Sequence, residues 1–431
     1  MKFDTAPSRG MKDLLPAEVE LRDRATATIL ATYRRYGFRR IETPALENLR
    51  LLQGSGGGEN EKLIYKVLKR GAKLDAATAR EDDLADLGLR FDLTVPLARY
   101  YAHHRAELPD PFKAIQIGPV WRAERPQKGR FRQFTQCDID ILGVVSEIAE
   151  VELILATAEA LIELGLERPR IRLNDRRILS AMATFCGVEP SRHGDFFITL
   201  DKLDKIGREG VERELRDAGH DAGAISKLFA MVLSADGESS SSLQRLAQVV
   251  PATSDAVESL RMILRAVGQE AGGRFTVGFD ASLVRGMGYY TGPIFEAAYG
   301  DYGGSIAGGG RYDRMVGRLL GQDVPACGFS IGFERVVSIL EGKSDQVRSE
   351  RDRVAFLFEP ADPLAEVAAE AGRLRGREGT VSLTLKRKNL ARQLDDLAGE
   401  GFGSYAVFRP GQSPEVKTLV RRTESAGGAD A

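Results

Sequence analysis

The sequence lacks the long apolar segments and paired cysteines that mark membrane proteins and disulfide-bonded proteins. No run of about 18 apolar residues occurs, so no membrane-spanning helix is expected. Residues 1–10 also lack the apolar stretch of a secretory signal. The three cysteines, Cys137, Cys186 and Cys327, lie far apart without CxxC spacing, which fits a reducing compartment and predicts no zinc knuckle. We therefore expect a cytoplasmic protein.

The chain also lacks an excess of either charge and lacks histidines in catalytic motifs. Lys and Arg number 61 against 62 Asp and Glu, so no global basic field indicates nucleic acid, and any RNA contact must come from local patches. None of the four histidines, His103, His104, His193 and His220, lies in a motif, which excludes a Ser-His-Asp mechanism. Neither GxGxxG nor GxxxxGK[ST] occurs between a strand and a helix, so Rossmann and P-loop sites are disfavoured.

The patterning along the 431 residues predicts more than one domain. Residues 1–168 read as the first part of a strand-rich core. Helical patterns dominate residues 169–273, which we interpret as an inserted helical module. Strand patterns return in residues 274–342 as the second part of the core.

After a charged linker, residues 353–431 read as a small α/β domain. Strand patterns alternate there with helical ones, the strands at Val354–Phe358, Val381–Leu385 and Tyr405–Phe408 and the helices at Leu364–Arg375 and Leu390–Leu397. Such alternation is typical of a partly parallel sheet.

The most informative segment runs from Ala114 to Ile141 and contains two strand patterns joined by a loop. On the second strand, alternate residues form an apolar face (Cys137, Ile139, Ile141) and an opposite, polar face (Phe134, Gln136, Asp138, Asp140). Gln136 and Asp140 lie about 13 Å apart along such a strand and would line one elongated pocket. A buried carboxylate is costly without a cationic partner, which favours a cationic ligand. The alternative is an exposed sheet face.

The loop between these strands is rich in cations. Around a single acid, Glu124, it carries Arg122, Arg125, Lys128, Arg130 and Arg132. Cations this close repel one another, so the arrangement favours a bound polyanion such as a triphosphate or an RNA end. The alternative is a solvated hairpin tip.

Two further segments carry candidate site residues. The stretch that holds Arg285, Tyr289 and Tyr290 is followed by glycine-rich residues 303–310, which suit a floor where the backbone approaches a ligand closely. Farther on, a predicted strand at Ala326–Ile331 and a helix at Phe333–Leu340 place Arg335 in a first helical turn. A guanidinium beside a helix N-terminus makes an anion site.

These residues lie in segments that resemble the motifs of class II aminoacyl-tRNA synthetases. RIETPALE is similar to the first class motif, VWRAERPQKGRFRQFTQCDIDILG to the second and GFSIGFERV to the third. LRFDLTVPLARY and SLVRGMGYYTGPIFE resemble blocks of the histidyl-tRNA synthetase family, and the likeness extends from Arg9 to about Leu340. The resemblance implies an α+β core, an antiparallel sheet flanked by helices, followed by an anticodon-binding-like domain. It also implies a homodimer that activates L-histidine with ATP and transfers it to tRNA(His).

The resemblance assigns roles residue by residue. Catalysis would rest on Arg122, Arg285 and Arg335. Histidine would contact Asp92, Leu93, Thr94, Arg122, Gln136, Asp140, Arg285, Tyr289 and Tyr290. ATP would contact Arg122, Glu124, Arg130, Arg132, Phe134 and Arg335, with Mg²⁺ on the outer phosphates and no dedicated protein metal site. The tRNA would contact Arg125, Gln127, Lys386, Arg387, Lys388 and Arg392. Gly288 departs from the family pattern, which usually has an acidic residue before the paired tyrosines.

Two other functions are compatible with this resemblance. The family has a noncatalytic relative, the regulatory subunit of ATP phosphoribosyltransferase, which typically lacks the C-terminal domain. An amino-acid-activating paralogue with a non-tRNA acceptor is the second. The presence of Arg122, Gln136, Arg285 and Arg335 favours the synthetase.

Overall fold

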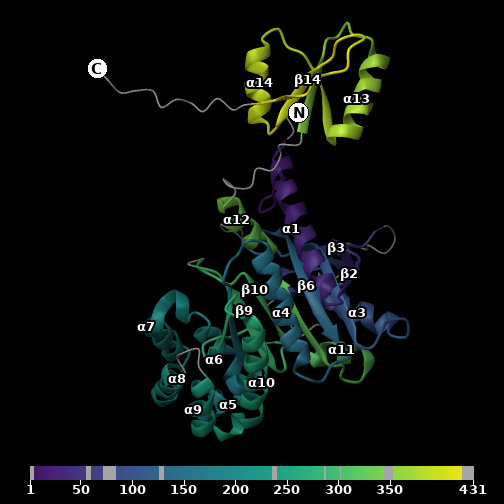
Figure 1. Cartoon of the computed structure of the whole chain (residues 1–431). Coiled ribbons are helices and arrows are strands. Elements are labelled where there is room, and N and C mark those ends of the chain that lie inside the picture. Colours follow the sequence, from purple (N-terminus) through teal and green to yellow (C-terminus); the bar gives the residue numbers. More distant parts are fainter. Residues whose placement is uncertain are drawn as a thin grey trace. The chain divides into compact units, whose positions relative to one another are not determined.

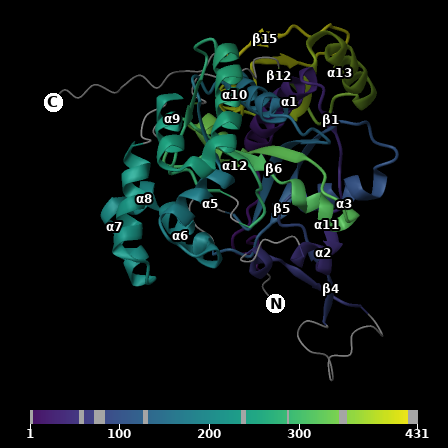
Figure 2. The same cartoon turned by 90° about the horizontal axis from the view of Figure 1, so that it is seen from below.

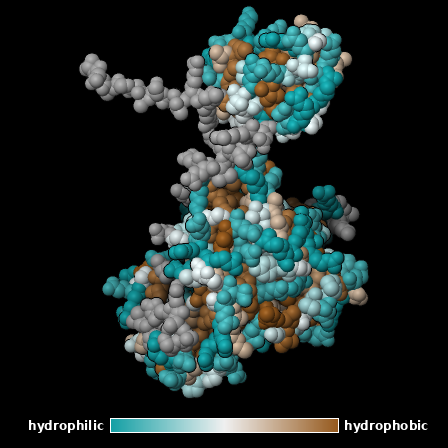
Figure 3. Space-filling view, viewed as in Figure 1, coloured by the Kyte–Doolittle hydropathy of each residue, from teal (hydrophilic) through white to brown (hydrophobic). Residues whose placement is uncertain are grey.

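The computed structural model of the chain describes residues 4–54, 60–70, 84–125, 131–234, 240–285, 288–300, 302–343 and 353–419. It divides into two compact units, residues 1–340 and residues 341–431, which we describe separately. No helix within the described ranges has the length and apolar character needed to cross a membrane. The face shown in Figure 3 is mostly polar, with scattered apolar residues.

A large mixed sheet forms the centre of the first unit (Figure 1). In the described ranges its strands, in spatial order, are β1 (Arg39–Arg40), β5 (Phe112–Trp121), β6 (Gln133–Leu142), β11 (Ala326–Ile331), β10 (Ala307–Arg311), β9 (Pro293–Ala298), β7 (Arg170–Asp175) and β8 (Thr276–Phe279).

The sheet is antiparallel through its middle and parallel at both edges, where β1 pairs with β5 and β7 with β8. The predicted antiparallel sheet is thus a mixed sheet, antiparallel through most of its pairs and with one parallel pair at each edge. Parallel neighbours need a long crossover connection. The chain supplies one before β5 and another, built of helices, before β8.

One face of this sheet packs on helices. Cys137, Ile139 and Ile141 are buried in the main apolar cluster, as the alternation along β6 predicts. The cluster is covered by α1 (Pro16–Arg35) and α4 (Ile148–Glu163), which contact each other, with α4 also on β6 and β11. The opposite face of β6 is thereby left to the polar residues.

A second apolar cluster lies beside the strand β5 and supports the loop before α3 (Thr94–His104). It includes residues of α3 and of α11 (Asp313–Leu320), which pack together. A small antiparallel sheet in the order β2 (Leu46–Asn48), β4 (Ala85–Leu89), β3 (Lys66–Leu68) adjoins it, with the short helices α2 (Leu49–Gln53) and η1 (Asn60–Leu63).

Helices fill most of the segment between β7 and β8. They are α5 (Arg176–Phe185), η4 (Pro190–Arg192), α6 (His193–Leu200), α7 (Leu203–Asp217), α8 (Ala222–Ser234), α9 (Ser240–Val249), η5 (Pro251–Thr253) and α10 (Ser254–Ala271). Figures 1 and 2 both show α5 to α10 gathered on the side of this unit away from α3 and α11. The segment predicted as a helical module, 169–273, begins with β7, a strand of the large sheet whose Ile171 and Leu173 are fully buried.

The second unit is an α/β fold. Its sheet has the order β13 (Thr380–Leu385), β12 (Arg353–Phe358), β14 (Ser404–Val407), β15 (Lys417–Thr418), with the first three strands parallel. Successive residues of β12 alternate between two apolar clusters, one with α13 (Leu364–Glu378) and one with α14 (Leu390–Gly399). Strand and helix positions agree with the sequence prediction.

Candidate functional site

The polar face of the large sheet forms the floor of a cavity of about 490 Å³. Strands β6, β10 and β11 contribute to its lining, as do the loop before α3 and the start of α12 (Phe333–Lys343). Most of the predicted site residues line this one cavity: Asp92, Thr94, Arg122, Glu124, Phe134, Gln136, Asp140, Arg285, Tyr289, Tyr290 and Arg335. Segments more than two hundred residues apart in sequence therefore meet in one site.

Several predicted residues lie elsewhere. Leu93 is buried and borders a smaller cavity, and Arg125 is outside the lining of the large one. Arg132 is also outside it, because its side chain donates hydrogen bonds to the Glu124 carbonyl (3.0 Å) and the Arg9 carbonyl (3.3 Å). Gln127, Lys128 and Arg130 lie outside the described residues.

The basic residues predicted to contact tRNA in the second unit lie between β13 and α14 or in the first turn of α14. Lys386 pairs with Glu359 at 2.7 Å and Arg387 with Asp396 at 2.7 Å. Lys388 and Arg392 are exposed. Their proposed role in binding RNA remains a prediction.

Asp140 marks one end of the cavity. The hydroxyl of Tyr312 donates a hydrogen bond to its Oδ1 at 2.5 Å. Burial raises the pKa of Asp140 to about 7, and burial likewise raises the pKa of Asp92 to about 6. Both carboxyls therefore ionise more readily when a cation enters the cavity. Sequence analysis missed Tyr312, whose only signal is its position directly after the glycine-rich strand β10.

Three buried acceptor atoms on the polar face of β6 lack a hydrogen-bond donor among the described residues. They are Oε1 of Gln136, Oδ1 of Asp138 and Oδ2 of Asp140. Burial, with the nearby Asp140, raises the pKa of Asp138 well above its usual value. Unsatisfied buried acceptors are costly, so this part of the cavity suits a ligand that brings N–H donors.

The other end of the cavity, near the loop between β5 and β6, is cationic. Arg122 donates from Nε to the Phe91 carbonyl at 3.0 Å, and its guanidinium lies 5.0 Å from the centre of the Phe134 ring. The guanidinium is thereby held beside an aromatic face on which a planar base can stack.

Arg285 and Arg335 lie on the opposite wall. Arg285 donates from Nε to Oε2 of Glu296 at 2.9 Å and from Nη2 to the Ser305 hydroxyl at 2.8 Å. Arg335 donates to the carbonyl and to the hydroxyl of Ser305, the latter at 3.2 Å. Gly308 lies under Arg285, because a Cβ at that position would lie 2.2 Å from the guanidinium carbon. The predicted close approach of glycine backbone is thus to an arginine of the site.

Glu334 fixes the start of α12, next to Arg335. It accepts hydrogen bonds from both terminal nitrogens of Arg22 (2.7 and 2.8 Å) and from the Thr135 backbone N–H (2.9 Å). Burial opposes its charge, but these donors hold the pKa of Glu334 below its usual value. Sequence analysis did not single out Glu334 or Arg22, because the contact spans 312 residues.

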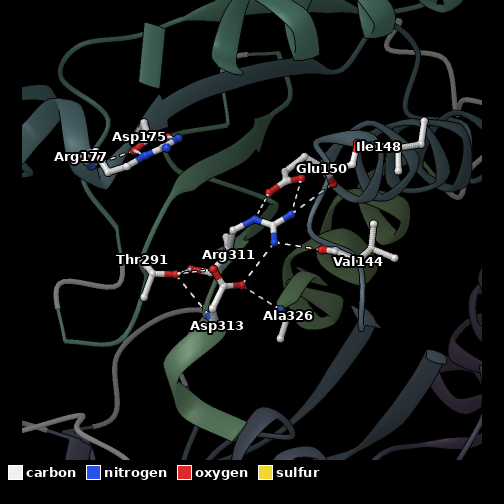
Figure 4. Close-up of polar contacts among 10 residues, drawn as sticks. Val144, Ile148, Glu150, Asp175, Arg177, Thr291, Arg311, Asp313 and Ala326 are labelled. Atoms are coloured by element: carbon white, nitrogen blue, oxygen red, sulfur yellow. Dashed lines mark hydrogen bonds and ion pairs between the residues drawn. The ribbon is translucent and has the colours of Figure 1, made fainter. Parts of the chain in front are cut away.

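A buried ion-pair network holds Arg311 and Asp313, the sequence neighbours of Tyr312 (Figure 4). Arg311 donates to both carboxylate oxygens of Glu150 in α4 (2.6 and 2.9 Å) and to the Val144 carbonyl at 3.1 Å. Asp313 accepts from Arg311 at 3.3 Å and from the Ala326 backbone N–H at 2.9 Å. Residues on both sides of Tyr312 are therefore tied to α4 and β11.

The described residues contain no group of three or more His, Cys, Asp or Glu side chains arranged to hold a metal ion. Glu124 does line the cavity at its cationic end. This donor set fits a divalent cation that is ligated mainly by the phosphates of a nucleotide.

Comparison with known proteins decides the family. A family profile described as Histidyl-tRNA synthetase matches residues 10–336, which include the whole lining of the cavity. The chain belongs to the histidyl-tRNA synthetase family. This confirms the resemblance drawn from the motifs, and the mixed sheet flanked by helices is consistent with the class II core.

Members of the histidyl-tRNA synthetase family match this chain over nearly its full length. A histidine–tRNA ligase of Leifsonia xyli subsp. xyli (strain CTCB07) is 48% identical over 427 residues, covering 96% of this chain and 98% of the relative. A probable histidine–tRNA ligase of Tropheryma whipplei (strain Twist) is 42% identical over 426 residues, covering 95% and 97%.

Solved structures agree. The histidyl-tRNA synthetase of Nostoc sp. PCC 7120 superposes with a TM-score of 0.79 at 26% identity, covering 97% of this chain and 95% of that one. A protein of Bacillus halodurans C, titled ATP phosphoribosyltransferase regulatory subunit/histidyl-tRNA synthetase, has a TM-score of 0.75 at 20% identity, covering 95% and 100%. That second likeness concerns the fold alone.

Proposed function

We propose that the cavity binds L-histidine and ATP side by side, forms histidyl-adenylate, and passes the histidyl group to tRNA(His). The reaction class follows from the family, since the protein is an aminoacyl-tRNA ligase and a histidine–tRNA ligase is among its relatives at 48% identity. The placement of the substrates rests on one observation: a single cavity combines unsatisfied acceptors and a carboxyl of raised pKa on β6 with the guanidinium groups of Arg122, Arg285 and Arg335.

Histidine fits the acidic end. Its ammonium and imidazole N–H groups supply donors for the acceptor atoms of Gln136, Asp138 and Asp140. The reacting carboxylate must lie beside the nucleotide phosphates, which Arg122 would bind. The ammonium is then near Gln136, and the imidazole extends toward Asp140 and Tyr312. A pocket that hydrogen-bonds an imidazole rejects apolar analogues by about 10⁴ or more without editing.

ATP fits the cationic end. Phe134 offers a ring for the adenine, and Arg122, Arg285 and Arg335 would surround the phosphates. Glu124 lines the same cavity, and Arg130, which lies outside the described residues, stays a predicted ATP contact. Mg²⁺ would enter with the outer phosphates and neutralise part of their charge.

Activation in this site needs no general base. The histidine carboxylate is already ionised near neutral pH, and pyrophosphate leaves without being protonated first. The chain contributes by holding the carboxylate in line with the α-phosphorus and by placing Arg285 against the charge that develops there. In the second step the terminal ribose hydroxyl of the tRNA attacks the carbonyl carbon of the adenylate, the bond from that carbon to the phosphate oxygen breaks, and AMP leaves after its phosphate has accepted the hydroxyl proton.

The remaining expectations extend this proposal. The second unit, through Lys386, Arg387, Lys388 and Arg392, would contact the anticodon region, and Arg125 and Gln127 the tRNA end that enters the cavity. A homodimer would form around the first class motif. The regulatory-subunit function is less well supported, because the candidate catalytic arginines and Gln136 all line the cavity.

Histidine-dependent exchange of pyrophosphate into ATP tests the activation step. Arg285→Ala should lower the rate by about three orders of magnitude, because a single positioned arginine contributes that much to phosphoryl chemistry. Arg261→Ala is the matched control, since Arg261 is exposed on α10 and pairs with Glu258 of the same helix. Exchange that requires an amino acid other than histidine would refute the substrate assignment.

A further inference from the structure

Ser305 lies between the two arginines on the wall formed by β10 and α12. Its hydroxyl oxygen is 2.8 Å from Nη2 of Arg285 and 3.2 Å from Nη1 of Arg335, and its carbonyl also accepts from Arg335. The residue is half-buried and lines the cavity. One small side chain therefore sets the spacing of two guanidinium groups that come from segments fifty residues apart.

The two arginines fix the direction of the Ser305 hydroxyl. A serine hydroxyl has one hydrogen to donate and two lone pairs to accept with. Guanidinium nitrogens only donate, so Arg285 and Arg335 occupy both lone pairs. The hydrogen must point away from them, and no acceptor for it exists among the described residues. Since Ser305 lines the cavity, the hydrogen is directed at whatever the cavity holds.

The surroundings of Ser305 suit an anion. The two guanidinium groups bring two positive charges to its oxygen. Glu296 offsets one of them through Nε of Arg285, on the same edge of that guanidinium as the Nη2 that contacts Ser305. The proposed function places the histidine carboxylate beside Arg122, so the anion at Ser305 is a different one. A phosphate oxygen accepts from hydroxyl and guanidinium donors at once.

We propose that Ser305 is a phosphate-binding residue of the ATP site, which holds Arg285 and Arg335 at a fixed spacing and donates its own hydrogen bond to a phosphate oxygen. This inference rests on the proposed function, because it takes the anion to be the triphosphate of ATP. It adds a contact that none of the motif arginines provides. The site then offers a phosphate hydrogen-bond donors from three side chains, the two guanidinium groups and the Ser305 hydroxyl.

Binding of adenosine, AMP and ATP to Ser305→Ala, measured by isothermal titration calorimetry with the full-length protein, tests the proposal. Removing a hydrogen bond to a charged group lowers affinity by about 10- to 100-fold. We expect that loss for ATP, a smaller loss for AMP and none for adenosine, which has no phosphate. The KM for histidine in pyrophosphate exchange should stay within about twofold of the wild-type value, whereas the KM for ATP should rise.

Three variants complete the experiment. Ser305→Thr keeps the hydroxyl and should bind ATP as the wild type does. Ser305→Gly also lacks the hydroxyl and should show the same loss as Ser305→Ala, so it replaces the alanine variant if that variant is poorly folded. Ser254→Ala is the matched control, because that hydroxyl is exposed and donates to the Pro251 carbonyl at 2.7 Å. Equal ATP affinity in Ser305→Ala and wild type, or an equal loss for adenosine, would overturn the proposal. Failure of the wild type to exchange pyrophosphate with histidine would instead refute the proposed function.

Discussion

Substituting Gly308 by alanine should displace Arg285 without unfolding the protein. The new Cβ would lie 2.2 Å from the guanidinium carbon and from Nη1, and 2.6 Å from Nη2. Ordinary contact begins near 3.4 Å, so the guanidinium must move by about 1.2 Å, the difference between 3.4 and 2.2 Å. The obstacle is the far end of a flexible side chain rather than backbone, and the strand β10 therefore has no reason to shift.

The displacement acts directly on the reaction. A misplacement of about 1 Å in a catalytic group costs about 100-fold in rate, or about 2.7 kcal/mol of transition-state stabilisation. Pyrophosphate exchange with saturating histidine and ATP should fall by that factor in Gly308→Ala.

Two comparisons separate this effect from a general loss of structure. The melting temperature of Gly308→Ala should stay close to the wild-type value, since no buried apolar contact is removed. Gly268→Ala, where an added Cβ meets nothing within 4 Å, should leave exchange unchanged. Full exchange activity in Gly308→Ala would refute the placement of Arg285 on this glycine.

Two more predictions concern buried charges. Because the pKa of Asp140 is raised to about 7, its carboxyl is largely protonated below that pH and becomes a weaker hydrogen-bond acceptor for the imidazole. The KM for histidine should therefore rise as pH falls from 8 to 6. Asp140→Asn should have a high KM with a smaller rise, since Asp92, with a pKa of about 6, still titrates in the same cavity. Glu150→Ala removes the two-pronged carboxylate partner of the buried Arg311 guanidinium and leaves the longer contact to Asp313, which should lower the free energy of unfolding in urea by about 3 kcal/mol. The exposed pair of Glu258 with Arg261 supplies the control for the second, because Glu258→Ala should cost less than about 1 kcal/mol. A flat KM profile in the wild type, or equal losses for the two glutamates, would contradict these expectations.

Local patterning was enough to predict the part of the site that lies on β6 and the strand and helix positions of the second unit. Period-two alternation assigns Gln136 and Asp140 to one face and Cys137 to the other wherever one face is buried, and no other part of the chain is needed for that assignment. Local patterning likewise predicted the strand β11 and the helix α12 after it, and so placed Arg335 in the first turn of α12.

Contacts between distant segments were beyond such patterns. The bond of Tyr312 to Asp140, the pairing of Arg22 with Glu334 and the hydroxyl of Ser305 between two arginines each depend on the order of strands in the sheet. The parallel pairing at the edges of the large sheet could not be predicted for the same reason. The sequence of β7 alternates as in any half-buried strand and does not indicate that its partners are β9 and β8.

The parallel pairing of β7 with β8 has a consequence for how this part of the protein tolerates change. In a parallel pair, the C-terminal end of one strand and the N-terminal end of the other lie at opposite edges of the sheet. The connecting segment must therefore run back along the length of the strands. The single helix α10, with 18 residues and a length of about 27 Å, covers that return and packs on both α4 and β8. Helices α6, α7 and α8 pack mainly on other helices of the same segment. They form an excursion whose length the strand order does not dictate. Its buried residues, such as Phe196, Leu215 and Leu228, nevertheless belong to the main apolar cluster, so a longer, shorter or exchanged segment must supply an equivalent apolar face.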